Sequence, residues 1–135
     1  MKFTYVFTTL DGSQKELKLR LTTGEEIEIE NSTKKSILEY VQEESITMIT
    51  TLLRYMIKEI NGEILNNFSF KNAQALLDEL VDSGLTFKKI MMDIIYETLV
   101  VSGFLEKEEW VEMKKAQTQA SKNIQKKTVE KLNEL

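Results

Sequence analysis

Hydrophobic and polar positions alternate along residues 2–22 in the way that two paired β-strands require. A two-residue turn at Asp11-Gly12 would place the two apolar rows on opposite faces of a hairpin. We therefore expect a three-residue loop with Gly12 in the left-handed conformation, which pairs Tyr5 with Leu17. The same register pairs Phe3 with Leu19. The two rows are Phe3, Tyr5, Phe7 and Leu17, Leu19, Leu21.

From about residue 34 the apolar positions recur every three or four residues, a spacing that predicts helices. We expect helices over about 34–44, 46–60, 70–82 and 86–101, the first capped within Asn31-Ser32-Thr33. The second should extend its buried face through Ile57 and Ile60 and stop at Asn61-Gly62, and the third should bury Val81. Residues 63–68 are expected to be a connection pinned by Ile64, Leu65 and Phe68. Caps for the later helices are expected at Ser45, Ser69 and Thr86, with stops at Gly84 and Gly103.

Residues 22–30 fit two structures. The alternation of Ile27 and Ile29 favours a third strand, whereas Thr23 with Glu26 has the spacing of a capping box that begins a helix. We favour the short helix.

The segment 86–101 is apolar on nearly every side. On a helix, Lys89, Asp93 and Glu97 form a single narrow polar stripe. We therefore expect this helix to lie at the centre of the core.

Beyond Leu105 the composition becomes highly charged, with acidic residues first and lysines later, an order that suits the helix dipole. We expect two parts: a domain over 1–105, and a long, solvated helix or tail over 106–135. The predicted fold class is α+β and predominantly α, with an N-terminal hairpin packed on a bundle of about five helices.

Composition removes several classes of chemistry. The 135 residues contain no cysteine and no histidine, so thiolate metal sites and the commonest general base are missing. The carboxylate pairs Glu25/Glu26 and Glu108/Glu109 are expected to be solvated surface charge, and the glycines stand singly, which does not form a phosphate-binding loop. We predict no enzyme, no catalytic residue, no cofactor and no metal.

The net charge of −4 argues against nucleic acid as a partner, and no segment is apolar for long enough to span a membrane. The N-terminus lacks the apolar run of a signal peptide, so we expect a cytosolic protein.

Four residues are candidates for protein binding. Met92 and Tyr96 lie one turn apart beside the polar stripe and would form an apolar patch if nothing covers them. Trp110 is a candidate anchor, although a tryptophan at the start of a charged helix more often packs on its own domain. Met113 is an adaptable apolar residue on the same charged helix.

Residues 17–105 resemble the tail assembly chaperones of long-tailed bacteriophages of Gram-positive hosts. The resemblance depends on the order and spacing of several short motifs, of which K-L-R-L-T-T and V-S-G-F are the most specific. The motifs are Leu17–Thr23, Ile27–Glu30, Lys35–Leu38, Leu52-Leu53 before Asn61-Gly62, Leu77–Glu79 before Gly84, and Val101–Phe104.

The resemblance implies a non-enzymatic protein of the host cytoplasm that self-associates into a spiral, coats the tape measure protein, and leaves before the tail is complete. It also implies a longer form, made by ribosomal frameshifting, that recruits the tail tube protein, and a helix at Glu25–Glu30. The alternative is a small helical regulatory module of a phage or mobile element that binds a host protein or DNA.

Overall fold

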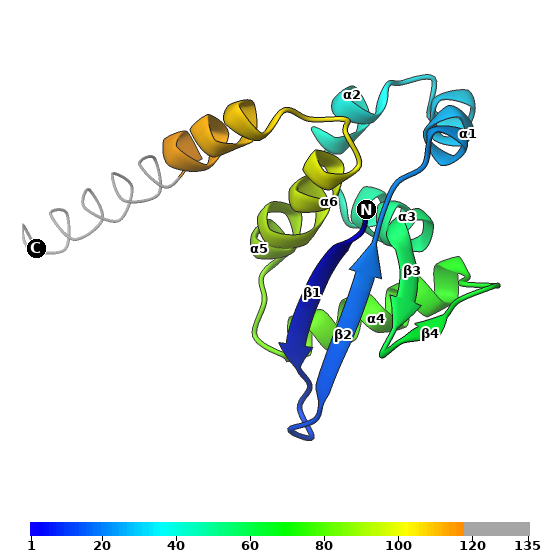
Figure 1. The fold of residues 1–135 in the computed structure, drawn as a ribbon, viewed down its shortest axis with the longest axis vertical. Coiled ribbons are helices and arrows are strands. Elements are labelled where there is room, and N and C mark those ends of the chain that lie inside the picture. Colours follow the sequence, from blue (N-terminus) through cyan, green and yellow to red (C-terminus); the bar gives the residue numbers. More distant parts are fainter. Residues whose placement is uncertain (118–135) are drawn as a thin grey trace, which may run out of the picture. The chain divides into compact units, whose positions relative to one another are not determined.

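The computed structural model describes residues 1–117, and the chain has a mixed α+β fold dominated by helices, as predicted (Figure 1). It divides after Leu105 into two units, at the position where the composition changes. The first unit, Met1–Leu105, contains a four-stranded sheet and all the labelled helices. Of the second, residues 107–117 are helical, and the rest of the predicted C-terminal helix lies outside the described residues.

The N-terminal hairpin has the predicted register. Strands β1 (Phe3–Thr8) and β2 (Gln14–Leu19) are antiparallel and pair Tyr5 with Leu17 and Phe3 with Leu19. The backbone N–H of Gly12 donates to the Thr9 carbonyl at 3.0 Å, and Gly12 has a φ of 87°. This is the expected tight turn followed by a left-handed glycine, which keeps both apolar rows on one face.

A second hairpin follows where the sequence analysis predicted the end of a helix and a connection. Strand β3 (Ile57–Ile60) joins β4 (Glu63–Ile64) through Asn61-Gly62, both of which have positive φ. The predicted helix through Ile60 is therefore wrong: α3 (Ile46–Met56) ends four residues earlier. Asn-Gly between two extended runs is the preferred two-residue hairpin turn, because both central residues need positive φ.

The four strands form one antiparallel sheet in the order β1-β2-β3-β4. Its inner face carries the buried Phe7, Leu17, Leu19 and Ile57. Figure 1 shows α3 and α4 behind the strands on this side. The outer face carries Thr4, Val6 and Thr8 of β1 and Ile64 of β4, all exposed, so the predicted burial of Ile64 is wrong.

Helix α1 (Thr23–Thr33) confirms the choice of helix over strand for residues 22–30. The capping box is one residue earlier than predicted, because Thr22 is the N-cap and Glu25 is its partner. Helix α2 (Ile37–Val41) is capped by Ser36, so the cap predicted within residues 31–33 is also wrong, and those residues end α1.

The next helices begin at the predicted caps. Ser45 caps α3, Ser69 caps α4 (Phe70–Asp82), and each hydroxyl accepts a backbone N–H three residues later. Gly84 has a φ of 109° after α4, which confirms the predicted stop. Val81, however, is exposed, whereas its neighbour Leu80 is fully buried.

The helix predicted over 86–101 is one run of helical turns capped by Thr86: α5 (Phe87–Ile90), the π-helical η1 (Met91–Ile95) and α6 (Tyr96–Val101). It is not buried all round, since Phe87 is exposed and Met92 and Val100 are half-buried. Helix α3 shares the centre of the core, because it contacts α2, α4 and η1 and buries Met48, Ile49, Leu52, Leu53 and Met56.

Candidate interaction surfaces

The two candidate binding residues of the central helix lie in the π-helical segment and directly after it. A π-helical turn holds one extra residue, which rotates the side chains that follow it relative to a regular helix. Met92 is half-buried, and Tyr96 is only 5% exposed. Burial raises the pKa of the Tyr96 phenol, and the charge of Glu44 adds to this effect. The two residues therefore do not form an exposed patch, and a binding role at this helix would fall to Met92.

The two candidates of the second unit also differ from each other. Trp110 is 2% exposed, and the Lys114 ammonium lies 4.9 Å from the centre of its ring, a cation–π contact. Met113 is 37% exposed. Trp110 thus behaves as a packed residue in the described structure, and Met113 is the candidate that solvent reaches. Whether either one binds a partner stays a prediction.

Exposed apolar side chains occur on several separate elements of the first unit. Scattered exposed apolar residues are normal on any protein, so only their arrangement carries information. Apart from Met1, they lie at the hairpin tip, on the outer face of the sheet and on helices, mostly near helix ends but in the middle of α1 for Ile27. They are Val6, Leu10, Ile27, Leu38, Ile46, Ile64, Phe70, Val81 and Phe87.

The outer face of the sheet is the surface that sequence analysis missed, because it did not predict β3 and β4. Val6 is 49% exposed and Ile64 is 74% exposed, on the two edge strands. Polar residues lie between them, and Lys2 pairs with Glu59 at 2.7 Å. A shallow hollow of about 420 Å³ on this face is lined by Val6, Gln14, Glu16, Asn61 and Gly62. The Asn61-Gly62 dipeptide was the available signal for this second hairpin.

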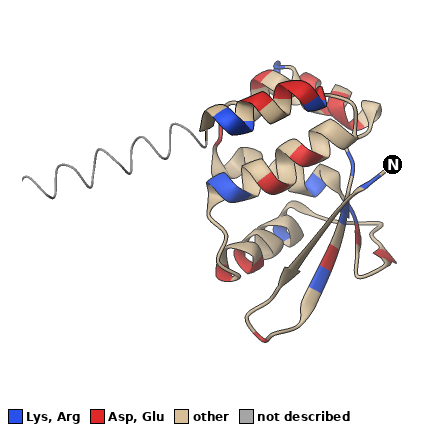
Figure 2. Cartoon of the chain, turned by 60° about the vertical axis from the view of Figure 1, so that its left-hand side comes forward, with Lys and Arg blue, Asp and Glu red and all other residues tan. Residues whose placement is uncertain are grey.

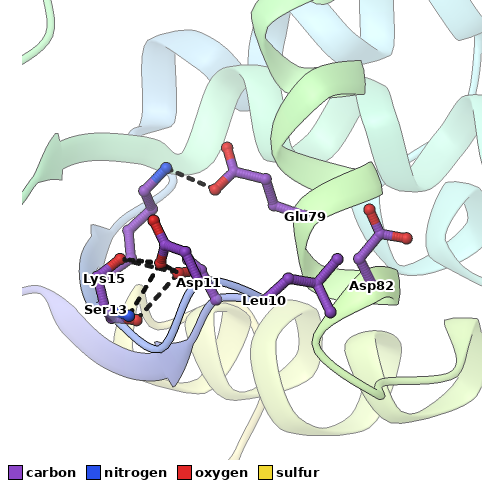
Figure 3. A pocket seen from close by; sticks show the side chains of 7 residues that line it. Leu10, Asp11, Ser13, Lys15, Glu79 and Asp82 are labelled. Atoms are coloured by element: carbon purple, nitrogen blue, oxygen red, sulfur yellow. Dashed lines mark hydrogen bonds and ion pairs between the residues drawn. The ribbon is translucent and has the colours of Figure 1, made fainter.

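A second open cavity, of about 320 Å³, lies between the tip of the first hairpin and α4 (Figure 3). Lys15 of β2 donates to Glu79 of α4 at 2.6 Å, which ties the hairpin to the helix. Leu10 and Asp82 complete its far side, as Figure 3 shows. The cavity is therefore closed on one side by an ion pair and is open to solvent on the other.

Three of the charged groups of this cavity, those of Asp11, Lys15 and Glu79, take part in hydrogen bonds or an ion pair within the protein. The Asp11 carboxylate accepts hydrogen bonds from the Thr9 hydroxyl and from the N–H and hydroxyl of Ser13. These bonds lower the pKa of Asp11 to about 2. A carboxyl group this acidic is ionised at neutral pH and cannot act as a general acid there. No group of three or more metal-ligating side chains is found among the described residues.

Of the two carboxylate pairs expected to be solvated, Glu108/Glu109 is exposed, but Glu25/Glu26 is structural. Glu26 is buried, and its Oε1 accepts the backbone N–H of Ile37 at 3.0 Å, which joins α1 to the start of α2. Glu25 belongs to the capping box and pairs with Lys58 at 2.7 Å. The expectation that this pair is solvated surface charge is wrong, and the observed role of both residues is to hold elements together.

Charge is mixed along the helices. Figure 2 shows acidic and basic residues interspersed on the face in view, including along the central helix, where Lys89 and Asp93 lie 3.6 Å apart. Within residues 1–117, none of the helices has both the length and the apolar composition needed to cross a membrane.

In comparisons with known proteins, no family model matches the chain, and neither a curated protein nor a solved structure matches it. The resemblance to tail assembly chaperones therefore depends on the sequence motifs alone.

Proposed function

We propose that this chain is a phage tail assembly chaperone, which self-associates and coats the tape measure protein in the host cytoplasm during tail assembly. The observation that carries the proposal is the ordered set of motifs from Leu17 to Phe104. In this proposal the chaperone is absent from the mature virion, and a longer frameshifted form recruits the tail tube protein.

The distribution of exposed apolar side chains supports the proposal. They lie on both edge strands, the hairpin tip and several helix ends, so one small subunit offers several modest apolar contacts. A tape measure protein is a long amphipathic helix, which many weak contacts from repeated subunits can cover. The best-defined polar groups, by contrast, stabilise the fold: Asp11 orders a turn, Glu26 joins two helices and Lys15 pairs with Glu79.

Coexpression with a fragment of the tape measure protein, encoded by the long coiled-coil-rich reading frame expected beside this gene, tests the proposal. We expect the fragment to be soluble with the chaperone and to precipitate without it. In the chaperone, Met113→Glu should reduce the soluble fraction of the tape measure fragment, because it places a charge on the exposed apolar side chain proposed to bind it. The control Met113→Leu should preserve that soluble fraction.

A fragment that is equally insoluble with and without the chain would refute the chaperone role. Salt-sensitive binding to duplex DNA by a monomer or dimer, with no effect on the fragment, would instead support the regulatory alternative.

A further inference from the structure

The free edge of strand β1 has an unusual chemical symmetry. In the segment Thr4-Tyr5-Val6-Phe7-Thr8, the residues next to Val6 on both sides are aromatic, and the residues two positions away on both sides are threonines. Antiparallel pairing with a second copy centred on Val6 would place Thr4 opposite Thr8, and Tyr5 opposite Phe7. Matched β-branched and aromatic pairs of this kind stabilise neighbouring antiparallel strands.

The backbone of β1 has the groups needed for such pairing. The Glu16 carbonyl of β2 accepts the N–H of Asn61, directly after β3, at 2.8 Å, and Arg20, directly after β2, donates its N–H to the carbonyl of Met56, directly before β3. The even-numbered residues of β2 therefore face β3. In an antiparallel sheet, successive residues of a strand direct their N–H and C=O groups to opposite neighbouring strands, so the odd-numbered residues of β2 bond to β1. Their partners on β1 are the odd-numbered residues, and Thr4, Val6 and Thr8 therefore direct their N–H and C=O groups to the free edge.

Within residues 1–117, no hydrogen bond satisfies these outward groups of Thr4, Val6 and Thr8, whose side chains are exposed. Backbone polar groups that are buried without a partner are rare, so this edge must face solvent. Proteins that keep such an edge unpaired usually protect it with lysine, proline or a bulge. Strand β1, with the sequence F-T-Y-V-F-T, has none of these, and in Figure 2 the strand that begins at the N-terminus is tan, the colour of uncharged residues.

We infer that β1 is a homodimer interface, in which two copies of this chain join their β1 strands antiparallel about a twofold axis at Val6, forming one continuous sheet. The pairs Thr4–Thr8, Val6–Val6 and Thr8–Thr4 would exchange about six hydrogen bonds. Because the strand is self-complementary, the contact is isologous, and a second copy satisfies it better than an unrelated peptide would. The contact belongs to the isolated chain and does not depend on the proposed client.

Val6→Lys is the direct test, since the twofold axis makes residue 6 face itself. Two lysines directly opposite each other repel, and the Val–Val contact is lost, so the dissociation constant should rise about tenfold. Ile64→Lys is the matched control: it makes the same change of an exposed β-branched residue on the same face of the sheet, at the opposite edge. It should leave the dimer intact in sedimentation velocity experiments.

A mixture of Val6→Lys and Val6→Glu proteins gives the sharpest result. At a concentration between the dissociation constants of the wild type and the variants, each variant should be monomeric alone, and the mixture should form a heterodimer, because lysine then faces glutamate across the axis. The rescue also excludes misfolding as the cause of the monomeric state. A wild-type protein that is monomeric at 500 μM, a Val6→Lys protein that dimerises normally, or a mixture that stays monomeric would each overturn the inference.

Crosslinking provides an independent readout that also works if larger assemblies form. The chain contains no cysteine, so Val6→Cys introduces one thiol. A hydrogen-bonded antiparallel pair has Cα atoms about 5.5 Å apart, which is within disulfide range. Mild oxidation should yield covalent dimers of Val6→Cys but not of Ile64→Cys. Equal crosslinking of both variants would contradict the β1 contact, and it would leave the client-binding test to decide the chaperone proposal.

Discussion

Removal of the Glu26 side chain should reveal how much one buried carboxylate contributes to the arrangement of α1 and α2. Glu26 is buried, and its Oε1 accepts the Ile37 N–H, the first backbone donor of α2. A hydrogen bond to a charged group contributes about 1.5–3 kcal/mol, and its loss leaves the Ile37 N–H without this partner. Glu26→Ala also gains about 0.4 kcal/mol of helix propensity.

The matched control is Glu30→Ala, in the same helix. Glu30 is exposed, and the substitution gives the same change in charge and the same gain in helix propensity. The difference between the two variants therefore reports the buried interaction together with a smaller helix-dipole contribution, since Glu26 lies in the first turn of α1, and we expect Glu26→Ala to be less stable by about 2 kcal/mol. For a urea m-value of about 2 kcal/mol/M, its unfolding midpoint should be about 1 M lower.

Urea unfolding followed by circular dichroism measures both midpoints. Glu26→Gln, which keeps an acceptor oxygen but not the charge, should fall between Glu26→Ala and the wild type. If Glu26→Ala and Glu30→Ala unfold at the same urea concentration, the carboxylate does not link α1 to α2, and the original expectation of a solvated surface charge would be restored.

Two further predictions concern α4 and the first hairpin. Leu80→Ala should cost about 3 kcal/mol because it opens a cavity in the core, whereas Val81→Ala should cost less than about 1 kcal/mol because Val81 is exposed. Equal losses in thermal unfolding would contradict the observed burial of Leu80 and exposure of Val81 on α4. Hydrogen bonds from Thr9 and Ser13 lower the folded-state pKa of Asp11 from 3.8 to about 2. The stability that Asp11 contributes is thus present above about pH 4 and lost as the pH falls toward 2. In acid titrations, Asp11→Asn should unfold with a weaker pH dependence across this interval, and an unchanged dependence would contradict the assignment.

The first hairpin could be predicted in detail because two independent constraints agree. Only a three-residue loop keeps the aromatic row and the leucine row on one face, and Gly12 can adopt the positive φ that this loop needs. The helix caps at Ser45, Ser69 and Thr86 were predictable for a similar reason, since each is a local interaction within four residues.

The second hairpin could not be separated from a helix by local pattern. Ile57 and Ile60 continue the three-to-four spacing of α3, and Asn61-Gly62 suits both a helix stop and a two-residue hairpin turn. The structure decides through a distant partner: β2 has a second edge, and β3 pairs with this edge antiparallel, with Leu17 opposite Ile60 and Lys18 opposite Glu59. The pairing of β3 with β2, which is distant in the sequence, cannot be predicted from a local stretch of about ten residues.

The accessibility of the candidate binding residues could not be predicted from the sequence. Tyr96 and Trp110 were chosen for their chemical type, but burial depends on tertiary packing, and the structure leaves Met92 and Met113 as the accessible members. The self-complementary edge of β1 was present in the sequence as a short palindrome. Its significance became visible only when β1 was found at the free edge of the sheet.

Native mass spectrometry of the purified chain mixed with its tape measure protein tests the central claim most directly. The account predicts one client chain carrying many copies of this subunit, in a complex that Met113→Glu weakens and Met113→Leu preserves. Spectra that contain only the separate proteins, at subunit concentrations of hundreds of micromolar, would contradict the account.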